Sequence, residues 1–126
     1  MKHRHRRHKD VPPSSSVPRW RGRVWIESEG GTFLGYGRAV LLERIQEHGS
    51  IAEAARSMEM SYKHAWDLVQ SMNRQAREPL VEKTTGGRGG GGARLTPVGC
   101  AAVTEFWDVY RRFQEFLTME SEKLRF

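Results

Sequence analysis

The stretch from residue 50 to residue 72 reads SIAEAARSMEMSYKHAWDLVQSM, and it predicts two capped helices in immediate succession. Ser50 and Ser61 are good N-caps, and Glu53 completes a capping box with Ser50. Two such helices joined by a very short turn are typical of a helix-turn-helix, with an ordinary pair of packed helices as the alternative. The apolar residues have the i, i+3, i+4, i+7 spacing of amphipathic helices: Ile51, Ala54, Ala55 and Met58, then Ala65, Leu68, Val69 and Met72.

Glu59 lies in the predicted turn between these helices. Such a turn often needs a residue in the left-handed backbone conformation, which costs a residue other than glycine about 1–2 kcal/mol. The neighbouring sequence offers no evident compensation. Glu59 is therefore an unfavourable residue for the predicted geometry.

The outer face of the second helix favours DNA recognition, because its polar side chains point away from the apolar face. Residues near the N-terminus of a recognition helix usually reach the floor of the major groove. Asp67 would repel phosphate, so it either accepts a hydrogen bond from a cytosine amino group or orients Lys63 across one helical turn. The leading candidates for DNA contacts are Ser61, Tyr62, Lys63, His64 and Asp67.

A glycine-rich run follows: residues 86 to 92 read GGRGGGG, between β-like segments at 80–84 and 93–96. This placement is typical of a DNA-binding wing, whose backbone can approach phosphates closely and whose Arg88 can contact a phosphate ridge or a narrow minor groove. A flexible hairpin tip is the alternative. The run also satisfies GxGxxG, but no helix opens directly from the glycines and no βαβ repeat surrounds them, which excludes a dinucleotide site.

Tyr62 and Trp66 lie on the flank of the proposed recognition face. Exposed rings there could stack on the bases of single-stranded nucleic acid. Aromatic residues on a helix flank more often pack inside the protein. We therefore expect Trp66 to lie in the core or against the wing.

Two further elements are predicted upstream. Residues 38–48 should form a helix, with Leu41, Leu42 and Ile45 on one face and Gly49 as the stop signal. Residues 20–27 alternate between apolar and polar side chains, which predicts a half-buried strand before the turn at Gly30 and Gly31.

The last predicted element is a long helix over about residues 97–121, opened by Thr96 as N-cap and Pro97 as first residue. Its apolar residues step by three and four in a heptad pattern. So broad an apolar surface favours pairing with a second copy, which would present two recognition helices to a palindromic site. Packing within the chain is the alternative. The candidate dimerisation residues are Val103, Phe106, Tyr110, Phe113 and Leu117.

The positive charge is concentrated at the N-terminus. Residues 1–25 hold eight Lys or Arg and one Asp, a charge of +7 against +6 for the whole chain, which leaves −1 for the remainder. We expect residues 1–18 to form a disordered basic tail that adds phosphate contacts without sequence preference, and residues 19–126 to form one domain. His3, His5 and His8 lack the partners of a metal site, so neither a metal nor a cofactor is expected.

Several classes are disfavoured. The N-terminus lacks the apolar core of a secretory signal, and no segment approaches the roughly 20 apolar residues of a membrane span, so a cytoplasmic location is expected. The single cysteine, Cys100, excludes an intramolecular disulfide, and we expect it to pack against the protein. No nucleophile, base or carboxylate arrangement indicates an enzyme.

Residues from about 37 to about 117 resemble the N-terminal DNA-binding domain of the molybdate-responsive ModE regulators, which is similar to the winged helices of LysR-type regulators. The resemblance implies a mainly α, winged helix-turn-helix fold with a small β-hairpin wing and a long C-terminal dimerisation helix. It implies a homodimer on double-stranded DNA. The most specific pieces are Ser61-Tyr62-Lys63, Ala65-Trp66-Asp67, Met72-Asn73, Thr85 to Ala93, Leu95-Thr96 and Gly99.

The chain also departs from that family. ModE regulators carry C-terminal oxyanion-binding domains, whereas this sequence ends at Phe126, so molybdate sensing does not carry over. Glu59 stands where the family commonly has glycine, and the basic tail is no part of the family pattern. Two alternatives to a sequence-specific regulator follow: a nonspecific or architectural nucleic-acid binder, and an interaction module that works with a separate oxyanion-sensing protein.

Overall fold

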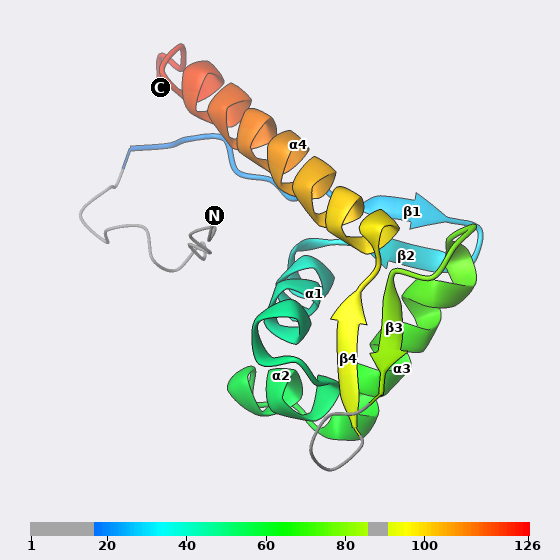
Figure 1. Ribbon diagram of the computed structural model, residues 1–126. Coiled ribbons are helices and arrows are strands. Elements are labelled where there is room, and N and C mark those ends of the chain that lie inside the picture. The colour runs from blue at the N-terminus through cyan, green and yellow to red at the C-terminus, as the bar shows by residue number, and fades with distance from the viewer. Residues whose placement is uncertain (1–16, 86–90) are drawn as a thin grey trace. The chain divides into compact units, whose positions relative to one another are not determined.

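The computed structural model describes residues 17–85 and 91–126. The described residues form two compact units: a helix-turn-helix unit within Trp25–Phe106, and a terminal unit that combines residues 17–24 with Trp107–Phe126. The mainly helical winged helix-turn-helix predicted from the sequence is confirmed (Figure 1). The elements are β1 (Ile26–Ser28), β2 (Gly31–Leu34), α1 (Tyr36–His48), α2 (Ile51–Ser57), α3 (Tyr62–Gln75), β3 (Val81–Thr84), β4 (Gly92–Leu95) and α4 (Pro97–Ser121).

The core of the helix-turn-helix unit lies between α1, α2 and α3. Small residues at the predicted inward positions, Ala54, Ala55 and Ala65, are fully buried and allow the helices to approach closely. α1 ends at Gly49, whose positive φ of 79° lets its N–H bond to the Ile45 carbonyl. The larger side chains that fill this core are Leu34, Leu41, Leu42, Ile45, Val69, Met72 and Leu80.

Both predicted serine caps are present. The Ser50 hydroxyl accepts from the Glu53 N–H at 3.0 Å, and the Ser61 hydroxyl accepts from the His64 N–H at 3.0 Å. Only the serine half of the capping box forms, because the Glu53 carboxylate pairs with Arg56 at 2.8 Å. Glu59 adopts a φ of 56°, so the turn uses the left-handed conformation expected there.

The predicted strand at residues 20–27 is largely wrong. Only Ile26–Ser28 is a strand, and it pairs antiparallel with β2, which the sequence analysis did not predict. Because β2 is four residues long, it offers no partner to residues further upstream. Trp20 and Ile26 are also exposed rather than half-buried.

The two arms of the wing form as predicted. β3 and β4 pair antiparallel from Val81 opposite Leu95 to Thr84 opposite Gly92. Two bonds attach β4 to the end of α1: the Ala93 N–H donates to the Gly49 carbonyl at 2.9 Å, and the Leu95 N–H donates to Gln46 at 2.9 Å. The loop at 86–90, including Arg88, lies outside the described residues.

The start of α4 belongs to the helix-turn-helix unit. Thr96 caps it as predicted, accepting from the Gly99 N–H at 3.0 Å, and its own N–H donates to the Leu80 carbonyl at 2.9 Å. A Cβ on Gly99 would overlap that same carbonyl oxygen, so only glycine allows this approach. Cys100 is exposed, which contradicts the expectation that it packs.

In the terminal unit, the extended segment at residues 17–24 lies along the rest of α4. The Trp20 N–H donates to the Ser121 hydroxyl at 2.7 Å. Further along, Gly22 approaches the Phe113 ring so closely that an added Cβ would lie 3.0 Å from it. The tail at 1–16, with His3, His5 and His8, lies outside the described residues. In the part of the chain that is described, no helix is long and apolar enough to cross a membrane.

Candidate nucleic-acid interface

The N-terminal half of α3 presents the side chains that the sequence analysis proposed as DNA contacts. The Ser61 cap starts the helix, and the inward positions of Ala65, Val69 and Met72 fix which face turns outward. The proposed contact residues on α3, namely Ser61, Tyr62, Lys63, His64 and Asp67, are all exposed. The helix therefore offers the rings of Tyr62 and His64 and several hydrogen-bonding groups to a partner.

Lys63 and Asp67 form an ion pair on this face. The Lys63 Nζ lies 3.1 Å from an Asp67 carboxylate oxygen, one helical turn away. This geometry agrees with the interpretation that Asp67 orients Lys63. Because both side chains are at least half exposed, the pair is a weak one, and Lys63 can exchange the carboxylate for a base or phosphate at small cost.

Trp66 lies outside the buried core, which leaves only the second part of the expectation for this residue, packing against the wing. Its side chain is 39% exposed, and that of Tyr62, one turn earlier, is 54% exposed. The reason is its place on the helix: Ala65 points inward, and the next residue is turned by about 100° onto the flank. The two rings therefore share one flank of α3.

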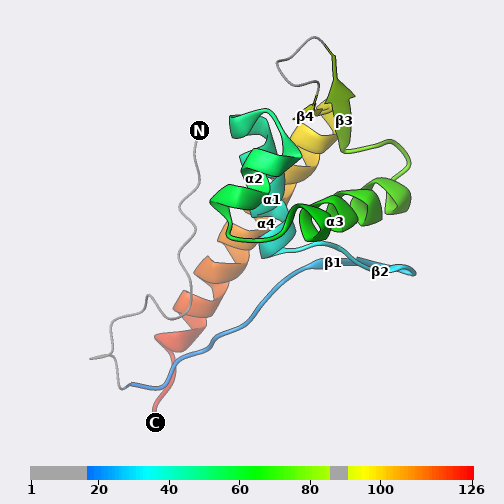
Figure 2. The same ribbon diagram turned by 90° about the horizontal axis from the view of Figure 1, so that it is seen from below.

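The C-terminal turn of α3 is attached to the β1–β2 hairpin, as Figure 2 shows from below. Gln75 donates to the Thr32 carbonyl at 2.9 Å and to the Ser71 hydroxyl at 3.0 Å, and the Ser28 hydroxyl donates to Gln75. Arg38 of α1 also bonds to Ser71, at 3.1 Å, and burial lowers the pKa of its guanidinium. These bonds fix the orientation of α3 against its neighbours.

Asn73 connects α3 to the base of the wing. Its Oδ1 accepts from the N–H groups of Leu80 and Val81 at 2.8 and 3.2 Å, and its Nδ2 donates to the Val81 carbonyl at 3.1 Å. One amide side chain thus fixes the direction in which β3 leaves the helix. The sequence analysis named Asn73 only within the ModE resemblance and gave it no role. The signal available in the sequence was that this amide side chain lies a few residues before the first arm of the wing, where it could bond to the backbone of that arm.

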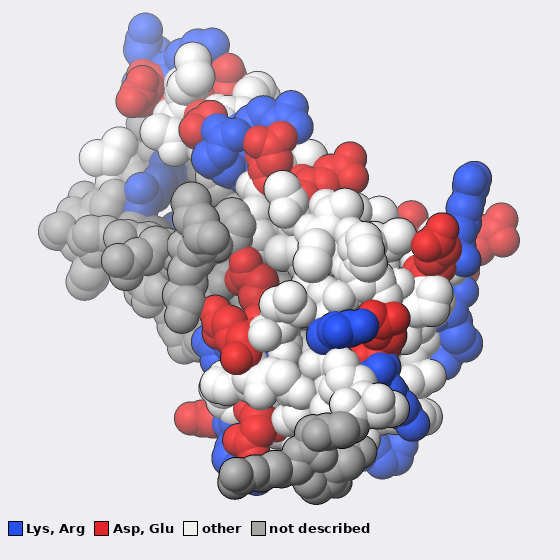
Figure 3. All heavy atoms as spheres, in the orientation of Figure 1, with Lys and Arg blue, Asp and Glu red and all other residues white. Residues whose placement is uncertain are grey.

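The charges around this interface are mixed. On the wing, Arg94 pairs with Glu82 across the strands at 2.9 Å, and Lys83 is exposed. On the face of the molecule drawn in Figure 3, acidic side chains are interspersed with basic ones. DNA affinity in this unit must therefore come from local contacts. Within 17–85 and 91–126, no group of three or more His, Cys, Asp or Glu residues could hold a metal ion.

Comparison with known proteins shows the family of this region. Residues 38–100, which include most of α1, all of α2 and α3 and both wing strands, match the bacterial regulatory helix-turn-helix proteins of the lysR family. The chain belongs to this lysR family. The matched region ends just after Gly99, where α4 approaches Leu80. The recognition helix and the wing are therefore both within the family's DNA-binding region.

Individual relatives are ModE proteins. The chain is 41% identical to the molybdenum transport protein ModE of Azotobacter vinelandii over 86% of its own length and 40% of the relative's. It is 39% identical to the transcriptional regulator ModE of Haemophilus influenzae over 71% of its length and 35% of the relative's. It is 41% identical to the DNA-binding transcriptional dual regulator ModE of Escherichia coli over 62% of its own length and 29% of the relative's.

The chain thus spans well under half the length of these relatives. The similarity to the ModE regulators inferred from the sequence motifs is confirmed. The relatives are named as regulators and a transport protein, and the shared region is a DNA-binding helix-turn-helix of the regulatory type rather than an enzyme domain.

In this lysR-family chain, the proposed dimerisation residues on α4 differ in accessibility. Val103, Phe106 and Leu117 are buried within the chain, and Tyr110 and Phe113 are half-buried. The segment at 17–24 passes close to two of these side chains, because a Cβ added at Gly22 would lie 3.0 Å from the Phe113 ring and 3.7 Å from Leu117. The apolar residues of α4 that remain exposed include Val109, Phe116 and Met119.

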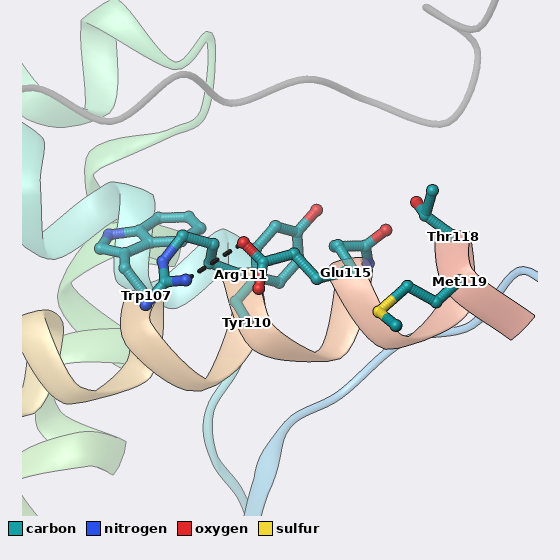
Figure 4. A pocket seen from close by; sticks show the side chains of 7 residues that line it. Trp107, Tyr110, Arg111, Glu115, Thr118 and Met119 are labelled. Atoms are coloured by element: carbon teal, nitrogen blue, oxygen red, sulfur yellow. Dashed lines mark hydrogen bonds and ion pairs between the residues drawn. The ribbon is translucent and has the colours of Figure 1, made fainter.

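An open groove of about 580 Å³ lies on the second half of α4. Figure 4 shows its lining side chains, which arise from successive turns of the helix: Trp107, Tyr110, Arg111, Gln114, Glu115, Thr118 and Met119. Arg111 pairs with Asp108 at 2.7 Å and with Glu115 at 3.2 Å. The hydrogen bond from Arg111 lowers the pKa of Asp108, and burial raises the pKa of the Tyr110 phenol.

Proposed function

We propose that this chain is a sequence-specific transcriptional regulator that binds duplex DNA as a homodimer at an inverted repeat. The observation that carries the proposal is the exposed N-terminal half of α3, within a region that matches a regulatory helix-turn-helix family. The capped end of α3 enters the major groove, where Lys63, Tyr62 and His64 contact base edges or phosphates. Ser61 and Asp67 complete the contact surface.

The wing supplies a second contact in this proposal. Arg88, at the centre of the glycine-rich loop, contacts the phosphate ridge or a narrow minor groove, where arginine is electrostatically favoured. The bonds from Ala93 to Gly49 and from Asn73 to Val81 support this role, because they hold the arms of the wing against α1 and α3.

Dimerisation takes place through α4. The exposed Val109, Phe116 and Met119 support this, since large apolar side chains on one helix favour burial against a partner. Tyr110, which lines the groove on the same helix, also contributes to the proposed dimer interface. The other proposed residues of α4 are buried or half-buried within the chain, so they stabilise the helix itself: Val103, Phe106, Phe113 and Leu117. A two-fold pair then presents two copies of α3 to symmetric half-sites.

The names of the relatives suggest the class of target gene. Two ModE relatives are named as transcriptional regulators and one as a molybdenum transport protein. We infer that the genes controlled by this chain serve molybdenum supply or use.

In-vitro selection of duplex DNA from a random library, at near-physiological salt, tests the proposal. The expected result is enrichment of an inverted repeat whose half-sites are about one helical turn apart. A single enriched half-site without symmetry would contradict the dimer but not the specific binding. A retained pool without any motif would contradict both, and would favour nonspecific binding through the N-terminal arginines or a module that depends on another protein.

A further inference from the structure

Tyr62 and Trp66 form a pair of exposed rings on the recognition helix. They are one turn apart, so their side chains are neighbours on the helix surface. Their exposed fractions are 54% and 39%, whereas Ala65, Val69 and Met72 of the same helix are buried. The fold itself does not explain this surface, because Ala65, Val69 and Met72 already fill the inner face of α3.

The neighbouring stripe of the same helix is polar. Lys63 and Asp67 follow Tyr62 and Trp66 by one residue each, and they pair with one another at 3.1 Å. Charged groups can read hydrogen-bond donors and acceptors on base edges, but the faces of two aromatic rings cannot. The apolar feature that the major groove offers is the C5-methyl group of thymine.

We propose that Tyr62 and Trp66 together form an apolar contact surface that recognises thymine methyl groups in the major groove. The inference rests on the proposed function, since it requires α3 to bind duplex DNA. Trp66 thereby becomes a specificity-determining residue beside the polar contacts already proposed. Stacking on single-stranded bases is less favoured, because the rings are placed beside a Lys-Asp pair on a recognition helix of a family that contains regulatory DNA-binding proteins.

The test replaces thymines by deoxyuridine, one position at a time, in the site enriched by the selection experiment. Deoxyuridine lacks only the methyl group and keeps the base pair. Removal of a contacted methyl should weaken binding by the wild-type chain about fourfold, the effect of exposing one CH2-sized group. The same substitution should have no effect on binding by the Trp66→Ala variant, because the two changes remove the same contact.

Tyr62→Phe is the matched control. It keeps the ring and removes the hydroxyl, so it should retain the sensitivity to deoxyuridine, whereas Tyr62→Ala should reduce it. Thermal unfolding, followed by circular dichroism, should match the wild type for Tyr62→Phe, and each alanine variant should still unfold cooperatively above the temperature of the binding assay.

Three results would overturn the inference, and they differ in what they mean for the proposed function. If deoxyuridine weakens specific binding equally in the wild type and in Trp66→Ala, the proposed thymine contact is contradicted and the proposed function is not. Tighter binding to single strands that disappears in Trp66→Ala would assign the rings to base stacking. The absence of any enriched duplex site would overturn the function and the inference together.

Discussion

At the scale of single residues, Lys63 is the side chain on which specific affinity should depend most. Lys63→Ala should weaken binding to the selected site about tenfold to a hundredfold, the effect expected for one good base contact. Combined with Arg88→Ala, it should abolish specific binding and leave the fold intact. Fluorescence anisotropy with labelled duplex measures both effects.

Lys123→Ala is the matched control for Lys63→Ala, because Lys123 is also an exposed lysine, paired with Glu120 at 2.9 Å beyond the last turn of α4. It should leave the preference for the selected site unchanged. Asp67→Asn separates the two roles considered for Asp67. A uniform, modest decrease in affinity would mean that it orients Lys63, and a changed preference at one base pair would mean that it reads cytosine. Wild-type affinity for the selected site in Lys63→Ala would contradict the assignment.

Glu59 should limit the stability of the helix-turn-helix. Its φ of 56° is unfavourable for any residue with a Cβ. Glu59→Gly should therefore raise the free energy of unfolding by about 0.5–1 kcal/mol, after the greater flexibility of glycine in the unfolded chain is included. Urea denaturation measures the change. Glu59→Ala separates the effect of the backbone conformation from that of the charge, because alanine removes the carboxylate and keeps the Cβ. If alanine raises the free energy of unfolding as much as glycine does, the left-handed conformation is not the cause of the gain.

At the scale of elements, the contact between the start of α4 and the base of the wing depends on Gly99. Gly99→Ala would place a methyl group on the Leu80 carbonyl, so it should lower the free energy of unfolding by about 1–3 kcal/mol. Gly37→Ala is the control within another helix, because a Cβ there meets no atom within 4 Å. That variant should be unchanged or slightly more stable, since alanine is the better helix former. Equal destabilisation by both substitutions would mean that the close approach is unimportant.

The helices could be predicted because their signals are local. Ser50 and Ser61 cap within three residues, and the burial of Ala54, Ala55 and Ala65 follows from helical spacing. The strand at 20–27 was largely wrong because alternation alone does not supply a pairing partner, and β2 pairs only with Ile26–Ser28. Residues 20–24 are extended but pair with no strand of the described residues.

The parts of the candidate site that the sequence did not reveal depend on contacts between elements. Nothing in the order of residues shows that Asn73 bonds to the backbone of residues 80 and 81, or that Gln75 reaches Thr32. The exposure of Trp66 was missed because an aromatic residue near an apolar face is usually buried, and here alanine takes the inward position. The exposure of Ser61, Lys63 and Asp67 was accessible to prediction because a capped helix fixes its outward side.

At the scale of the whole molecule, the N-terminal charge should control salt dependence rather than sequence preference. Deletion of residues 1–18 removes five of the 21 Lys and Arg residues. The slope of log affinity against log salt should fall by about 0.9 for each phosphate that the shortened chain no longer neutralises, while the selected motif stays the same. Titrations at several salt concentrations measure the slope. If the deletion removes the motif itself, recognition does not reside in α3.

Self-association should depend on the exposed apolar residues of α4, namely Val109, Phe116 and Met119. Phe116 is 56% exposed, and Phe116→Glu would place a charge where the proposed dimer buries a ring. The dimer dissociation constant should rise about tenfold or more, as determined by sedimentation equilibrium. Thr104→Glu, at an exposed polar position of the same helix, should leave it unchanged. A wild-type chain that sediments as a monomer at high concentration would contradict dimerisation altogether.

The three hydrogen bonds of Asn73 have a consequence for the DNA. Because this side chain joins α3 directly to the first strand of the wing, the span between α3, proposed for the major groove, and the base of the wing is set by the protein. A duplex whose natural groove width or curvature does not match that span must bend or twist to meet both contacts. Base pairs that no side chain touches would then influence affinity through their stiffness, and flexible pyrimidine–purine steps between the two contacts would favour binding.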